Sequence, residues 1–216
     1  MATCLSIATM VLCFLGFFML CISTGTRRWK EDINYVRGTR TYIGLWQACI
    51  ESEGNNDGYP TTQGVICDKD YLRPHLNEPP PWFNATRALM LLSCIGTGFG
   101  LIFYITAFIT DNSKKTGSRY FPCVLIIFIS GLCAVIALSI FTTHRKWGVQ
   151  YEVGGGEFYA QYWTQVEGEA VVDGTRFKIE TWLRWSYGIG WGGVAMTLFA
   201  LITAAFSDLT RRQVRY

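Results

Sequence analysis

The sequence predicts an all-α membrane protein, a bundle of four transmembrane helices with a small antiparallel β-sheet outside the membrane. Only 16% of the 216 residues are charged, whereas soluble domains typically carry about 25%. Four apolar stretches are long enough to cross a hydrocarbon core of roughly 30 Å, and none contains Asp, Glu, Lys, Arg or His. The predicted spans are residues 4–24, 88–110, 120–143 and 185–206.

The first stretch could instead be a cleaved signal peptide. It has no basic leader, its apolar run is long for such a segment, and no Ala-x-Ala site follows it. We therefore expect a retained helix, and one tetraspan domain over residues 1–216.

Basic residues in short loops near the membrane mark the cytoplasmic side. They occur in the turn 111–119, and again in the tail 207–216 after the fourth span. Both termini are therefore expected in the cytoplasm, and the loops 25–87 and 144–184 outside the cell. The basic residues concerned are Lys114, Lys115, Arg119, Arg211, Arg212 and Arg215.

Local patterns predict strands in both outer loops. Residues 41–46 are rich in β-formers, and Asn55-Asn56-Asp57-Gly58 is a turn signal, so a small sheet with a hairpin is expected. Residues 175–180 alternate polar and apolar side chains, which favours a strand that extends this sheet. Three glycines at 154–156 followed by the aromatic stretch 158–163 indicate a flexible insertion with available rings.

Eight cysteines are present, and all except Cys49 and Cys67 lie in apolar runs, where a thiol packs as a small hydrophobe. Because the first loop is expected to face an oxidising space, we predict a disulfide between these two. The alternatives are two free thiols, or a zinc site with His75 that would still lack a fourth ligand.

The first loop carries an ordered set of residues between two spans: Trp29, then Gly44-Leu45-Trp46, then Cys49 and Cys67. This order resembles the signature of the superfamily that contains claudins, peripheral myelin protein, epithelial membrane proteins and lens fibre membrane intrinsic protein. The stretches 82–90 and 185–191 resemble the lens protein in particular. The resemblance covers all four spans and implies a left-handed, claudin-like helix bundle carrying an extracellular sheet.

Several residues have expected roles. Trp29, Gly44, Leu45 and Trp46 are expected to anchor the sheet onto the helix ends. Arg87 is expected to begin the second helix at the outer surface, where it could snorkel or pair with a loop carboxylate. Asn84 heads the sequon Asn84-Ala85-Thr86, so it is expected to carry a glycan.

The sequence gives little support to catalysis, cofactors, metal or nucleic acid. His75 and His144 lie far apart in the chain, and the basic residues form no stripe suited to a phosphate backbone. Residues 188–193 match the spelling of a dinucleotide fingerprint, but no strand precedes them and they lie in a span. Together with Gly96, Gly98 and Gly100, these glycines are expected to let helices pack closely, within the bundle or between protomers.

Three functions are compatible with these patterns. The first is a non-enzymatic protein of cell–cell contacts in the plasma membrane, acting in adhesion or membrane organisation. It would bind membrane lipid and form homo-oligomers, or meet related tetraspan proteins, through Phe158, Tyr159, Tyr162 and Trp163. The second is an auxiliary subunit of a channel or receptor. The third is a claudin-type paracellular ion barrier or pore, in which charges such as Asp57 or Asp68 would line the path.

Overall fold

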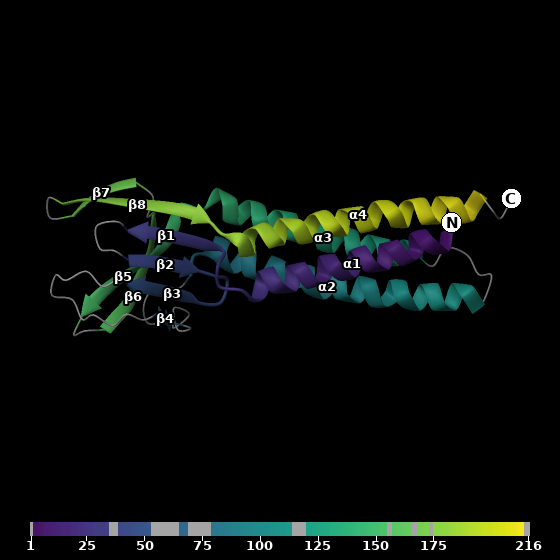
Figure 1. Ribbon diagram of the computed structural model, residues 1–216, viewed down its shortest axis with the longest axis horizontal. Coiled ribbons are helices and arrows are strands. Elements are labelled where there is room, and N and C mark those ends of the chain that lie inside the picture. Colours follow the sequence, from purple (N-terminus) through teal and green to yellow (C-terminus); the bar gives the residue numbers. More distant parts are fainter. Residues whose placement is uncertain are drawn as a thin grey trace. The chain divides into compact units, whose positions relative to one another are not determined.

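The computed structural model describes residues 2–34, 39–52, 65–68, 79–113, 120–154, 157–165, 168–172 and 175–213 (Figure 1). The chain divides into two compact units. The helical unit comprises Met1–Thr24, Thr86–Ser139 and Ile189–Tyr216. The sheet unit comprises Gly25–Ala85 and Ile140–Gly188, and so includes end residues of all four helices.

The four predicted spans are present as helices. They are α1 (Ala2–Gly25), α2 (Pro81–Ser113), α3 (Tyr120–Thr143) and α4 (Trp185–Gln213). Each contains a stretch long and apolar enough to cross a membrane. The chain is therefore a multi-pass membrane protein.

The second helix begins seven residues before the expected span. Proline suits the first position of a helix, because its φ is already helical and its missing N–H would have no partner there. Pro81 occupies that position, and the N–H of Phe83 donates to the carbonyl of Pro80 at 2.9 Å. The apolar run alone locates the membrane-crossing part of the helix, whereas Pro81 marks the residue at which the helix begins.

The core of the helical unit is built in layers to which all four helices contribute. One layer joins Cys13 of α1, Leu101 of α2, Ile127 of α3 and Ala200 of α4. A second layer contains Tyr104, Tyr120, Cys123 and Ala204, with Met10 packed against it. Such layers form only if the four helices run side by side, as Figure 1 shows for this unit.

Helices α1 and α4 pack closely in opposite directions. The hydroxyls of Ser6 and Ser207 lie 2.8 Å apart, and Thr9 Oγ1 donates to Thr203 Oγ1 at 2.9 Å. Further along, a Cβ on Gly193 would lie 2.9 Å from Leu20 Cγ and 3.2 Å from the carbonyl oxygen of Gly16. The helices can meet this closely because neither glycine has a side chain.

Helices α2 and α3 meet through glycines in the same way. A Cβ on Gly96 would lie 2.1 Å from Ser130 Oγ, and one on Gly100 would lie 2.5 Å from Ile127 Cγ1. These contacts join helices of one chain, so at these positions the glycines serve packing within the bundle. Gly188 differs, because a Cβ there would meet nothing within 4 Å.

The sheet unit contains a six-stranded antiparallel sheet. Its strands are β1 (Lys30–Asn34), β2 (Thr39–Ile43), β3 (Ala48–Ser52), β4 (Val65–Asp68), β7 (Gly168–Val172) and β8 (Thr175–Leu183). They follow the order β4-β3-β2-β1-β8-β7. The strand expected at 175–180 therefore extends the sheet as predicted, by pairing with β1. The expected turn at Asn55–Gly58 lies outside the described residues.

The aromatic stretch 158–163 differs from the expectation of an insertion without a partner strand. It lies in β6 (Glu157–Gln165), which pairs with β5 (Trp147–Gly154) in a separate two-stranded sheet. The register shifts between Gln150 and Tyr151, which marks a bulge or irregularity. Gly154 ends β5, and residues 155–156 between the strands lie outside the described residues.

Replacing Gly193 by alanine should destabilise the bundle by about 1–3 kcal/mol, because the added methyl group has no space against Leu20 and Gly16. The measurement is unfolding of the purified protein in detergent micelles. Gly188→Ala is the matched control, and it should be neutral or stabilise by up to about 1 kcal/mol through higher helix propensity. Equal stability of the two variants would contradict this close helix contact.

Candidate functional site

Trp29 contacts strands and helix ends of the sheet unit. Its side chain is fully buried, and its ring meets Phe141 edge-on at a centroid distance of 4.9 Å and Tyr187 at 6.1 Å. Its N–H donates to the carbonyl of Ile43, and its own carbonyl accepts from Arg184 N–H at 2.9 Å. Trp29 therefore ties β2 and the end of β8 to the last turn of α3 and the first turn of α4.

The Gly44-Leu45-Trp46 segment is a tight connection after β2. A Cβ on Gly44 would lie 2.5 Å from Arg27 Cα, so only glycine allows the two backbones to approach. The N–H of Gly44 donates to the carbonyl of Gln47 at 3.0 Å. Leu45 is fully buried, whereas Trp46 is 36% exposed, so the three residues do not share one role.

Cys49 and Cys67 form a disulfide between the neighbouring strands β3 and β4, where they are directly paired. The other cysteines form no disulfide and lie in α1, α2 and α3: Cys4, Cys13, Cys21, Cys94, Cys123 and Cys133. The predicted pairing is confirmed. The alternative ligand His75 lies outside the described residues, which contain no cluster of three metal-binding side chains.

Three consecutive charged residues of β1 are buried, which the sequence did not indicate. Lys30 Nζ lies 3.0 Å from Asp32 Oδ1 and donates to the carbonyl oxygen of Trp147 at 2.6 Å. Asp32 also accepts from Thr181 Oγ1 at 2.7 Å. Glu31 is fully buried and forms an ion pair with Arg184. Each charge thus has a partner from the second loop or its junction with α4.

The sequence could not have revealed this cluster. Lys30, Glu31 and Asp32 look like part of a balanced, solvated loop, and they have no apolar alternation. Their partners lie more than a hundred positions later in the chain. The one available signal was the predicted strand at 175–180, which had to pair with something and pairs with β1.

Tyr42 stands next to Glu31 across the strands. Its hydroxyl donates to Glu51 Oε2 at 2.8 Å, and the guanidinium of Arg28 lies 5.0 Å from the centre of its ring. Burial, followed by the Glu51 carboxylate, raises the pKa of Tyr42. The folded state thus favours the neutral phenol of Tyr42. This preference contributes to folding stability, and the contribution is lost as the pH rises through the folded-state pKa.

Arg87 and Asn84 lie on α2, inside the helix and not before it. Arg87 is only 6% exposed and lies in the second turn of the helix, whereas it was expected at the first residue. Asn84 is exposed in the first turn, and its Nδ2 donates to the carbonyl of Pro79 at 3.3 Å. The position of Asn84 leaves its side chain accessible at one end of the helix.

A glycan on Asn84 stays a prediction. Treating the cell-expressed protein with a glycosidase should increase its gel mobility, and Asn84→Gln should remove that shift. Thr86 completes the sequon, but it is fully buried, so Thr86→Ala would confound glycosylation with packing. An unshifted wild-type band would rule the glycan out.

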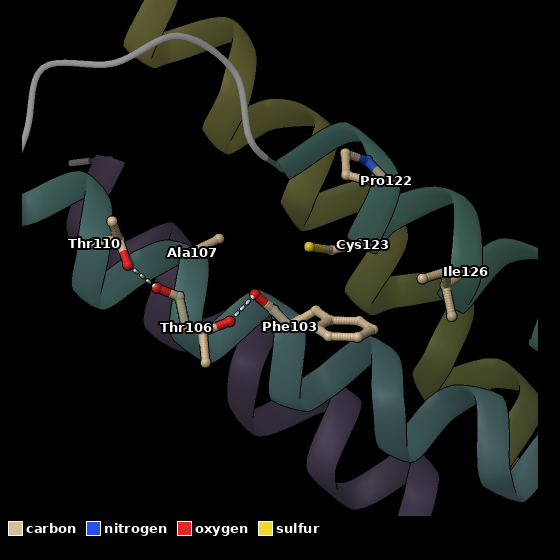
Figure 2. A pocket seen from close by; sticks show the side chains of 7 residues that line it. All are labelled: Phe103, Thr106, Ala107, Thr110, Pro122, Cys123 and Ile126. Atoms are coloured by element: carbon tan, nitrogen blue, oxygen red, sulfur yellow. Dashed lines mark hydrogen bonds between the residues drawn. The ribbon is translucent and has the colours of Figure 1, made fainter.

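A groove lies between α2 and α3 within the helical unit (Figure 2). Its lining is Phe103, Thr106, Ala107, Thr110, Pro122, Cys123 and Ile126. The hydroxyl of Thr106 donates to the carbonyl of Phe103 at 2.9 Å, and that of Thr110 to Thr106 at 2.8 Å. These polar groups are thus used by the helix itself, and the groove presents mostly hydrocarbon and no catalytic acid or base.

Replacing Trp29 by alanine should destabilise the protein by about 3–5 kcal/mol, because a fully buried ring and its contacts with Phe141 and Tyr187 are lost. Denaturant unfolding in micelles measures this. Trp182→Ala is the control, since that ring is 55% exposed and should cost less than about 1 kcal/mol. A similar loss of unfolding free energy in both variants would contradict the conclusion that Trp29 stabilises the sheet unit more than an exposed tryptophan does.

The Lys30–Asp32 pair should behave as a coupled unit. Lys30→Met alone leaves a buried carboxylate without its cation, which should cost about 3–5 kcal/mol. Adding Asp32→Leu should recover a large part of that loss, because no uncompensated charge remains. A double-mutant cycle of unfolding free energies measures the coupling, and simple additivity would contradict it.

Comparisons with known proteins agree with this architecture. The model of the PMP-22/EMP/MP20/Claudin family matches residues 2–164. Lens fiber membrane intrinsic proteins of Rattus norvegicus and Homo sapiens are each 28% identical over 187 residues, which is 87% of this chain and 82% of theirs. Human transmembrane protein 202 is 23% identical over 93% of this chain and 57% of its own length. Because the family match covers well over half of a chain with four apolar helices and an antiparallel sheet, this protein belongs to the PMP-22/EMP/MP20/Claudin family.

Proposed function

We propose that this tetraspan protein acts by contact and not by catalysis, as an adhesion or membrane-organising component of cell–cell contacts. Its partner is a second copy or a related tetraspan protein on the same or a neighbouring cell. The observation that carries the proposal is the β5–β6 hairpin. Among the described residues, these two strands pair only with each other and do not join the six-stranded sheet.

A two-stranded sheet has two edges, and each edge carries backbone N–H and C=O groups able to pair with another chain. An isolated hairpin is also only marginally stable in water, so a partner would stabilise it. Strand β6 contains Phe158, Tyr159, Tyr162 and Trp163, residue types that commonly dominate interface energetics. Their side chains lie outside the described part of the structure, so the proposal rests on strand pairing and composition.

The proposed topology places both sheets outside the cell and both termini in the cytoplasm. The basic residues of the turn 111–119 and of the tail support this orientation. The pairing of Ser6 with Ser207 also brings the first turns of α1 and the last turns of α4 to the same end of the helical unit. An even number of spans requires that the two termini share a side.

Replacing Tyr159, Tyr162 and Trp163 together by alanine should abolish most cell aggregation at unchanged surface level, because the aromatic anchors of the contact are lost. The measurement is aggregation of cells that express the protein, with surface protein quantified in parallel. Trp182→Ala with Trp185→Ala is the matched control, since both rings are exposed outside the hairpin.

Four outcomes distinguish the possible functions. Normal aggregation of the triple variant would overturn a recognition role for β6. Loss of surface protein would assign the rings to folding or membrane anchoring, as tyrosine and tryptophan beside spans often serve. Unchanged aggregation with altered epithelial conductance would favour the paracellular barrier, and co-purification with a channel would favour the auxiliary subunit.

A further inference from the structure

One face of the six-stranded sheet carries an aligned row of residues. Directly opposite neighbours across five strands are Trp182, Glu31, Tyr42, Cys49 and Cys67. Directly opposite residues in antiparallel strands point to the same face. Glu31 and Cys49 are fully buried and Tyr42 is 9% exposed, so other groups cover the middle of this row.

Three arginines contact the row. Arg184 forms an ion pair with Glu31, the Arg28 guanidinium lies 5.0 Å from the Tyr42 ring centre, and Arg27 Nη1 lies 3.2 Å from Cys67 Sγ. All three arginines are exposed, whereas the residues beneath them at Glu31, Tyr42 and Cys49 are buried. The guanidinium groups are therefore the outer layer of this face, which we call the arginine row.

The arginine row has an excess of positive charge. Arg184 neutralises Glu31, and the Glu51 carboxylate beside the row accepts a hydrogen bond from the hydroxyl of Tyr42. Arg27 and Arg28 meet sulfur and an aromatic ring, which do not cancel a full charge. Among the described residues, neither of these two arginines has a carboxylate within ion-pair distance. Two guanidinium groups thus keep N–H donors available for an anion.

Chain connectivity places the arginine row at the ends of two spans. Arg27 and Arg28 follow Gly25, the last residue of α1, and Arg184 directly precedes Trp185, the first residue of α4. At roughly 3.5 Å per residue, their backbones lie within about 10 Å of those helix ends. The headgroup region on each side of a bilayer extends over a similar depth of roughly 5–8 Å.

Exposed indoles lie beside these arginines in the chain and the sheet. Trp46 belongs to the segment that packs against Arg27, Trp182 heads the aligned row, and Trp185 follows Arg184. All three are at least one third exposed. Tryptophan and arginine at the ends of spans are typical of side chains that lie among lipid headgroups.

We propose that Arg27, Arg28 and Arg184 form a docking surface for the phosphate groups of glycerophospholipids in the leaflet on the sheet's side of the membrane. Guanidinium binds phosphate through paired N–H donors, and it does so more strongly near the low-dielectric membrane boundary. The arginine row contacts β1 and β2 of the first loop, and its Arg184 directly follows β8 of the second. Bound phosphates would therefore hold strands of both loops at the depth of the lipid headgroups.

The test counts lipids retained by the full-length protein in detergent, using native mass spectrometry. Phosphatidylglycerol is compared with diacylglycerol of the same acyl chains, which lacks the phosphate, and with a soluble poly-glutamate peptide. Wild type should retain phosphatidylglycerol in preference to the other two. The variant R27Q/R28Q should bind it about 30-fold more weakly, given about 1 kcal/mol per arginine near a membrane surface.

The matched comparison is R145Q/K146Q, which removes the same charge from two exposed residues just beyond α3 that do not belong to the arginine row, and it should weaken binding less than R27Q/R28Q does. Arg184 is left intact because it compensates the buried Glu31. The variant R27K/R28K keeps the charge and should lose only part of the affinity, and it keeps the test decisive if R27Q/R28Q does not fold. Equal retention by R27Q/R28Q and wild type, equal loss in the control, or preferential binding of the acidic peptide would each overturn the proposal.

Discussion

The sheet unit depends on one constraint: three neighbouring charges in β1 are out of water and must be compensated. An isolated buried charge is costly, so strand β1 is tolerable in the interior of the sheet only with its partners in place. Those partners are Arg184, Thr181 and the carbonyl of Trp147, and all belong to the second loop or its end. Strand β1 therefore depends on the second loop for the counter-ion of Glu31 and for hydrogen bonds to Lys30 and Asp32.

The residues of the first-loop signature have structural contacts here. Trp29 packs on the helix ends, Gly44 allows two backbones to approach, and the disulfide joins the edge strand β4 to β3. Each fixes the shape of the sheet, and the exposed members of the signature are Trp46 and Cys67. A signature that defines a scaffold leaves recognition to segments outside it, such as the β5–β6 hairpin proposed above.

The parts of the fold that the sequence predicted are those set by local or compositional rules. Four charge-free stretches located the spans, the position of eight cysteines selected one pair, and alternation at 175–180 revealed β8. Close helix packing at Gly96, Gly100 and Gly193 also followed from residue size. The burial of Lys30, Glu31 and Asp32 did not, because it depends on partners remote in the chain. The strand character of 158–163 was missed because glycines before an aromatic run indicate flexibility as readily as the end of a strand.

The pairing of β1 with β8 has a consequence for biosynthesis. The two strands are separated by α2 and α3, so β1 leaves the ribosome long before its neighbour is made. Until then, β1 is an open edge, and Glu31 lacks its counter-ion Arg184. Contacts between such remote segments form late and slowly. A chain whose second loop ends up on the wrong side of the membrane would leave this edge of β1 unpaired.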